Sequence, residues 1–195
     1  TKNLLVFLAL LFSLNEGWEI TKTEELFLLL TKTTLSFFIF CFLSSSIYLI
    51  NDILDKDKDS LHPEKSKRPI ASGKISIKTG LIVSFFIGII SIISAFFLNK
   101  NFGMISITYL SIMSLYSLYL KNVIILDVAI ISLGFVLRTI SGALVIGVPI
   151  SNWLYICTGI GALFIALSKR RSELDKGGEN VFKQRNTLQI YKPNQ

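Results

Sequence analysis

Four polar residues in the first half of the chain have the types and spacing of a metal site. In chain order they are Asn51, Asp52, Asp55 and Asp59. At about 100° per residue they share one face of a helix, while Asp57 points away from that face. Converging carboxylates repel one another unless a cation lies among them, and hard oxygen ligands suit Mg²⁺, which commonly joins carboxylates to phosphate. The spacing therefore predicts a Mg²⁺ site at these four residues, with the three aspartates of the set as catalytic residues.

The same stretch resembles two other kinds of loop. Charges alternate in sign in KDKDS, as they do in many solvated loops, and composition alone favours a loop of that kind. An EF-hand loop is excluded, because Ser60 stands where that loop needs glycine and Ser66 where it needs glutamate. The residues that follow favour the metal site, because Lys65, Lys67 and Arg68 are the bases that a polyanionic substrate requires.

The acidic cluster follows directly on one of several long apolar runs. The 195 residues are 51% hydrophobic, with a mean hydropathy of +0.60. Because about 20 apolar residues cross a bilayer, these runs predict an all-α, polytopic bundle of transmembrane helices. Short joints make neighbouring helices antiparallel within one catalytic domain, residues 1–195. The six predicted spans cover residues of about 4–14, 26–50, 80–98, 102–120, 123–148 and 153–168.

The basic residues indicate how this bundle is oriented. Most of the 20 lysines and arginines fall in alternate connections, which the positive-inside rule places in the cytoplasm. The polar loops 51–78 and 169–195 are therefore expected to face the cytoplasm, and the predicted metal site with them. The net charge of +7 follows from this topology. Nucleic acid is thus excluded as a partner, and the lipid bilayer is the expected surrounding.

Two ionisable residues lie inside the fifth predicted span. Ionisable groups within a membrane are costly, which makes Asp127 and Arg138 functional candidates. Eleven residues separate them, so they share a helix face about 16 Å apart and cannot pair with each other. Asp127 is either functional or an interfacial residue paired with Lys121. Arg138 is expected to point into the bundle, toward a phosphate or an acid on another helix.

Several motifs carry a resemblance to a known family. The run N-D-x-x-D-x-x-x-D at residues 51–59 resembles the first aspartate-rich motif of the UbiA superfamily of intramembrane prenyltransferases. LHPEKSKRPIASGKIS, LYSLYLKNVIILDV, GFVLRTISGALVIGVPIS and ALSKRRSEL look more narrowly like the decaprenyl-phosphate phosphoribosyltransferase branch. The resemblance covers essentially the whole chain. Members usually have about nine helices, so we expect a UbiA-like bundle with about six of them, truncated at both ends.

The resemblance implies transfer of 5-phosphoribose from phosphoribosyl diphosphate to a polyprenyl phosphate of the decaprenyl type, with Mg²⁺ and with release of diphosphate. It implies an integral protein of a prokaryotic cell (inner) membrane whose active site faces the cytoplasm, and it leaves a homo-oligomer open. Basic residues from several segments of the chain, together with the Asn51 amide, are expected to bind the phosphates of the two substrates. Lys2 and Asn3 are expected to cap the substrate pocket. The expected substrate-binding residues are Lys2, Asn51, Lys67, Arg68, Lys121, Arg138, Lys169 and Arg170.

Two rival functions are weighed against this expectation. The nearer rival is a UbiA-type prenyltransferase, which moves a prenyl group from a prenyl diphosphate to an aromatic or lipid acceptor. The wider superfamily has a second aspartate-rich motif where this chain reads K-R-R-S-E-L-D, and that departure argues against the prenyl donor. The remote rival is a transporter, with Asp127 and Arg138 along a pathway. Spans three and four offer only Ser, Thr and Tyr in their outer halves, which does not favour a pathway.

Overall fold

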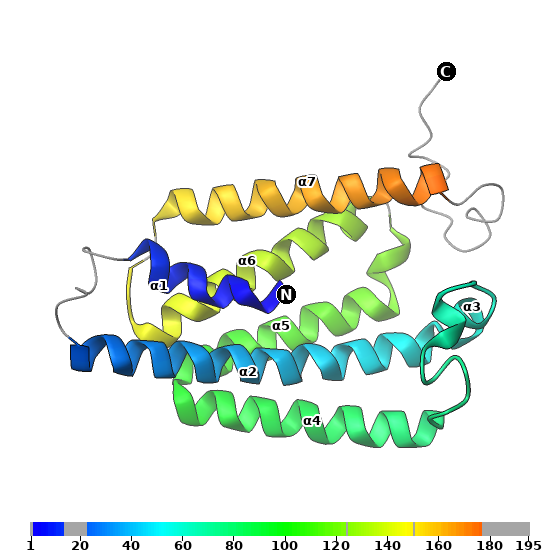
Figure 1. Cartoon of the computed structure of the whole chain (residues 1–195), viewed down its shortest axis with the longest axis horizontal. Helices are drawn as coiled ribbons and strands as arrows, with labels where there is room; N and C mark the ends of the chain where they lie inside the picture. The colour runs from blue at the N-terminus through cyan, green and yellow to red at the C-terminus, as the bar shows by residue number, and fades with distance from the viewer. Residues whose placement is uncertain (1, 14–22, 124, 150, 177–195) are drawn as a thin grey trace.

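The computed structural model describes residues 2–13, 23–123, 125–149 and 151–176, and all regular structure in these ranges is helical (Figure 1). This confirms the predicted all-α class. Short 3₁₀ helices and turns join the longer elements. The helices are η1 (Lys2–Phe7), α1 (Leu8–Phe12), α2 (Thr23–Leu54), α3 (Lys56–Ser60), η2 (Lys65–Lys67), α4 (Ile77–Leu98), α5 (Lys100–Leu118), η3 (Leu120–Asn122), α6 (Leu126–Ile146) and α7 (Asn152–Lys176).

Among the described residues, four helices are long and apolar enough to cross a membrane, namely α2, α4, α6 and α7. The protein is therefore an integral membrane protein. The other two predicted spans are also helical: Lys2–Phe12 is a shorter apolar segment, and the 19-residue α5 carries several polar side chains. Helix α2 continues to Leu54 and α7 to Lys176, beyond their apolar runs. The reason is that hydropathy marks the membrane boundary, whereas Lys, Arg, Glu and Leu can extend a helix beyond it.

Helices α2 and α4 pack closely because α4 presents a stripe of small residues to α2. A stripe of small residues lets two helix backbones approach within a membrane, where burial of apolar area does not drive association. Ser46 and Ser84 exchange hydrogen bonds, since each hydroxyl donates to the carbonyl oxygen of the other at 2.9 Å. The buried positions of α4 are Gly80, Ser84, Gly88, Ser91 and Ala95.

The centre of the bundle is aromatic and receives the N-terminal helix. The ring of Phe40 on α2 lies 5.7 Å from that of Phe102 and 5.1 Å from that of Tyr109, both on α5. The helices η1 and α1 lie across α6 and α2 (Figure 1). Glycine at position 142 of α6 permits this contact, because a Cβ there would collide with the backbone of Val6. The first residues of the described chain are thereby held against the middle of α6.

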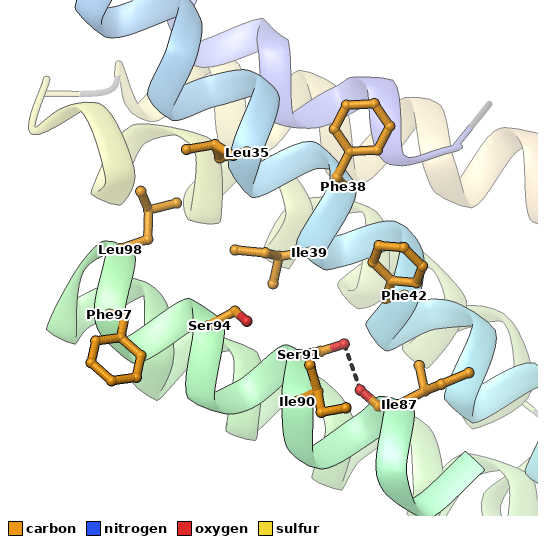
Figure 2. Close-up of a pocket in the computed structure, with 10 residues that line it drawn as sticks. All are labelled: Leu35, Phe38, Ile39, Phe42, Ile87, Ile90, Ser91, Ser94, Phe97 and Leu98. Atoms are coloured by element: carbon orange, nitrogen blue, oxygen red, sulfur yellow. Dashed lines mark hydrogen bonds between the residues drawn. The ribbon is translucent and has the colours of Figure 1, made fainter. Parts of the chain in front are cut away.

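An apolar groove of about 650 Å³ lies between α2 and α4 (Figure 2). Phe38 and Phe42 border it from α2, while Ile90 and Phe97 border it from α4. All four side chains are exposed, and Phe97 is 88% exposed. Such a surface suits acyl chains of the bilayer, which solvate apolar side chains as well as another helix does.

Candidate active site

The predicted acidic residues lie where α2 ends and α3 begins. Helix α2 stops at Leu54, yet the backbone N–H of Asp55 donates to the carbonyl of Asn51 at 2.9 Å, and that of Asp59 donates to the carbonyl of Asp55 at 2.8 Å. These bonds keep the spacing of a helix across the break. Asp59 is accordingly buried, with 4% of its surface exposed, whereas Asp57 is exposed. The face predicted from the spacing therefore exists in the structure.

Arg68 bridges two of the aspartates with a single nitrogen. Its Nη1 donates to Oδ1 of Asp52 at 2.7 Å and to Oδ2 of Asp59 at 2.8 Å. The loop after α3 folds back to bring Arg68 there, and Ile70, only 1% exposed, anchors it close to Gly80 of α4. Arg68, one of the three bases of this loop, thus belongs to one cluster with Asp52 and Asp59, as their proximity in the sequence suggested.

Lys121 engages the third aspartate from the connection between α5 and α6. Its Nζ donates to Oδ1 of Asp55 at 2.6 Å, and both side chains are largely buried. The helix η3 places Lys121 there, 66 residues away in sequence. The alternative that Lys121 pairs with Asp127 is therefore wrong.

The predicted metal ligands are divided between these two bases. Within the described ranges, no three side chains of His, Cys, Asp or Glu are grouped closely enough to hold one metal ion. Asp52 and Asp59 nevertheless share one cationic nitrogen, and Asn51 lies one turn before Asp55 with a side chain that has no hydrogen-bond partner in the described chain. Mg²⁺ is usually held by one or two carboxylates together with substrate phosphates. The donor set therefore fits Mg²⁺, although a ligand group of all four residues stays a prediction.

A second polar group lies deeper in the bundle, around Arg138. This side chain is 4% exposed and makes no ion pair with a described residue. Its Nε donates to Asn3 Oδ1 at 2.8 Å, its Nη1 to the carbonyl of Gly134 at 2.7 Å and its Nη2 to the hydroxyl of Tyr109 at 2.5 Å. Arg138 points into the bundle as predicted, but its described partners are neutral.

A cavity of about 250 Å³ adjoins this network. It is lined by Lys2, Asn3, Ser44 and Tyr48. The hydroxyl of Ser44 lies 3.3 Å from both Asn3 Oδ1 and the Tyr109 hydroxyl, so it connects the cavity wall to the partners of Arg138. Ser44, Tyr48 and Tyr109 were not predicted to belong to a site, because uncharged polar residues are common within spans and carry no signal by themselves.

Asp127 forms a sealed ion pair with Arg170 of α7. Arg170 donates from Nε to Oδ2 at 2.7 Å and from Nη2 to Oδ1 at 2.9 Å, and the hydroxyl of Tyr116 donates to the same Oδ1 at 2.8 Å. Asp127 is 0% and Arg170 3% exposed. Arg170 was predicted to bind substrate, and here its guanidinium joins α7 to α6. Lys169, its neighbour, is exposed, as is Lys67 in the loop after α3. Residues 177–195 of the predicted last loop lie outside the described residues.

The architecture defines a membrane-spanning helical bundle with a cluster of acids and bases at one end and a pocket lined by polar side chains beside the N-terminal helix. The sequence profile of the UbiA prenyltransferase family matches residues 4–174. The chain therefore belongs to the UbiA prenyltransferase family.

Known relatives and solved structures agree with this assignment. The chain is 33% identical over 190 residues to the decaprenyl-phosphate phosphoribosyltransferase of Mycolicibacterium smegmatis, covering 97% of this chain and 58% of that protein. It is 30% identical to the enzyme of the same name from Mycobacterium tuberculosis, covering 97% and 62%. A UbiA homolog from Archaeoglobus fulgidus, solved bound to GPP and Mg²⁺, has the same fold, with a TM-score of 0.78, 19% identity, and coverage of 95% of this chain and 62% of that one. The chain thus spans about three fifths of the length of these relatives.

Proposed function

We propose that the protein transfers 5-phosphoribose from phosphoribosyl diphosphate to a polyprenyl phosphate of the decaprenyl type, in the presence of Mg²⁺. The reaction would take place at the cytoplasmic face of a prokaryotic inner membrane. The carrying observation is the meeting of three carboxylates with Arg68 and Lys121 at the end of α2. Two relatives named as decaprenyl-phosphate phosphoribosyltransferases support the choice of substrates.

The proposed reaction needs little general acid or base catalysis from the protein. A phosphate monoester is already an anionic nucleophile, so attack on C1 of the ribose needs no strong general base. Breaking the bond between C1 and the diphosphate leaves negative charge on the leaving group, so catalysis depends on cations positioned around it. Mg²⁺, when bound, would supply part of this charge as a Lewis acid.

The residues of the cluster have complementary tasks in this proposal. Asp52 and Asp59, which share one nitrogen of Arg68, would hold the metal, with Asn51 and Asp55 beside them. In this structure Arg68 and Lys121 bind the carboxylates. With substrate and metal present, the carboxylates would bind the metal ion instead, and Arg68 and Lys121 would bind oxygen atoms of the diphosphate. Ionic contacts within the cluster would thus change when substrate binds, without any large movement of the helices.

A prenyl donor is the second candidate, because a homologous fold was solved with GPP and Mg²⁺. A prenyl diphosphate carries its charge at one end, whereas phosphoribosyl diphosphate carries it at both ends of a polar sugar. The second cationic group, Lys2 and Arg138, lies apart from the acidic cluster and favours the ribosyl donor.

The donor is tested by direct comparison of the two reactions. Full-length protein in nanodiscs with Mg²⁺ is given labelled phosphoribosyl diphosphate and a polyprenyl monophosphate, and the lipid-extractable label is counted. We expect a labelled lipid product that disappears when EDTA is added. Turnover of a prenyl diphosphate with an aromatic acceptor, and none with the ribosyl donor, would establish the second candidate.

A further inference from the structure

The connection between α5 and α6 carries Lys121 into the acidic cluster. Helix α5 ends at Leu118, η3 covers Leu120–Asn122, and α6 begins at Leu126. Lys121 is 8% exposed, and its Nζ donates to Oδ1 of Asp55 at 2.6 Å. A lysine amine sits on a flexible four-carbon stem, so its position depends on where the backbone of this short connection is held.

The backbone bonds inside the described part of this connection are weak. The N–H of Asn122 donates to the carbonyl of Tyr119 at 3.3 Å, and that of Val123 donates to the carbonyl of Leu120 at 3.1 Å. Both distances exceed the common value of about 2.9 Å. Ile125, just before α6, has a φ of 71°, a left-handed conformation that strains a β-branched residue. A conformation of this kind persists only where surrounding contacts impose it.

One side-chain hydrogen bond joins the two ends of the connection. The hydroxyl of Tyr116, in the last turn of α5, donates at 2.8 Å to Oδ1 of Asp127, in the first turn of α6. Arg170 already makes two bonds to this buried carboxylate, so the Tyr116 bond is not needed to compensate its charge. The two bonded residues lie on either side of η3, so their bond restrains the segment between them.

We infer that Tyr116 is a positioning residue, whose bond to Asp127 holds η3 where Lys121 reaches Asp55. The inference deepens the proposed function, in which Lys121 binds the diphosphate, and rests on it for the effect on turnover. The position of the amine is a separate matter that can be measured without turnover. Tyr116 would act on the diphosphate only through Lys121.

The first experiment measures how well the Lys121 amine is protected. Full-length protein in nanodiscs, without Mg²⁺ or substrate, is treated with trace acetic anhydride, and the acetylation rate of each lysine is read by mass spectrometry. Tyr116→Phe removes one hydroxyl and keeps the ring. It should raise the rate at Lys121 about tenfold, as expected for the loss of one hydrogen bond to a charged group. The rate at Lys100, an exposed base at the start of α5, should not change.

Two further variants calibrate this measurement. Asp55→Asn takes away the charged partner of Lys121 and should raise its acetylation rate at least as much. Tyr119→Phe is the matched control, because Tyr119 is 67% exposed in the same connection, and it should leave the rate at Lys121 within about twofold. Unchanged protection of Lys121 in Tyr116→Phe would overturn the inference, and so would an equal rise in Tyr119→Phe.

Kinetics of ribosyl transfer then separate positioning from a general loss of structure. Tyr116→Phe should raise the KM for phosphoribosyl diphosphate about tenfold. In a Lys121→Met background it should add less than about twofold, because residues that act through one another are not additive. An equal rise in both backgrounds would show that Tyr116 does not act through Lys121. If the unchanged protein transfers no ribosyl group, the proposed function fails, while the acetylation rates still decide whether Tyr116 positions Lys121.

Discussion

Acidic and basic side chains meet at two places in this bundle, and the two places are built differently. Where α2 ends, Asp52, Asp55 and Asp59 each meet a base through one nitrogen, and Arg68 is 38% exposed. Between α6 and α7, Asp127 receives two bonds from Arg170 and one from Tyr116, and the pair is sealed from solvent. Single, partly exposed contacts can be exchanged for a ligand, whereas a buried bidentate pair costs much to open. The first place is suited to binding and the second to holding helices together.

The largest expected effect comes from breaking the open cluster. Asp52→Asn or Asp55→Asn should lower turnover by about 10²-fold or more, because charge stabilisation of the leaving group is lost, while the protein stays folded. Asp57→Asn is the matched control, since Asp57 is exposed on the opposite side, and it should change turnover by less than about twofold. Initial rates of labelled ribosyl transfer measure all three. Equal losses at the three positions would remove the geometric basis of the site.

Breaking the buried ion pair of Asp127 and Arg170 should lower the stability of the fold and leave the catalytic step unaffected. Arg170→Met leaves the buried Asp127 carboxylate without its guanidinium, which should cost about 3–5 kcal/mol of folding free energy. Arg171→Met, on the exposed side of the same helix, should cost less than about 1 kcal/mol. Denaturant unfolding in mixed micelles provides the comparison. If Arg170→Met folds normally but loses donor binding, the structural role assigned to Arg170 is wrong and the substrate-binding role predicted from the sequence stands.

A smaller effect is expected from Arg68→Lys, which tests whether Arg68 must bridge two acceptors or need only carry a positive charge. Arg68→Lys keeps the positive charge but loses the planar fork that serves two acceptors. We expect a roughly tenfold rise in the KM for phosphoribosyl diphosphate, with folding unchanged because the loop is anchored by Ile70. Steady-state kinetics give the value. A KM equal to that of the unchanged protein would show that only charge matters at this position.

Some of this arrangement could be predicted from the sequence, and the reasons are physical. Apolar runs and short joints determine a helical bundle, and the period of a helix places Asp57 opposite its neighbours, because both are local properties of the chain. The pairing of Asp55 with Lys121 and of Asp127 with Arg170 was missed, since it depends on how helices distant in sequence pack. The role of Tyr109 could not be predicted either, because it depends on a hydrogen bond with Arg138, which lies on another helix.

The central claim is that the cluster at the end of α2 binds metal together with the diphosphate, and metal binding tests it most directly. Mn²⁺, as a spectroscopic substitute for Mg²⁺, is titrated into the full-length protein in nanodiscs and followed by electron paramagnetic resonance, with and without phosphoribosyl diphosphate. We predict one bound Mn²⁺ whose affinity rises when the diphosphate is present, is lost in Asp52→Asn and is unchanged in Asp57→Asn. Binding of Mn²⁺ that is equally strong in Asp52→Asn and in the unchanged protein would contradict the account.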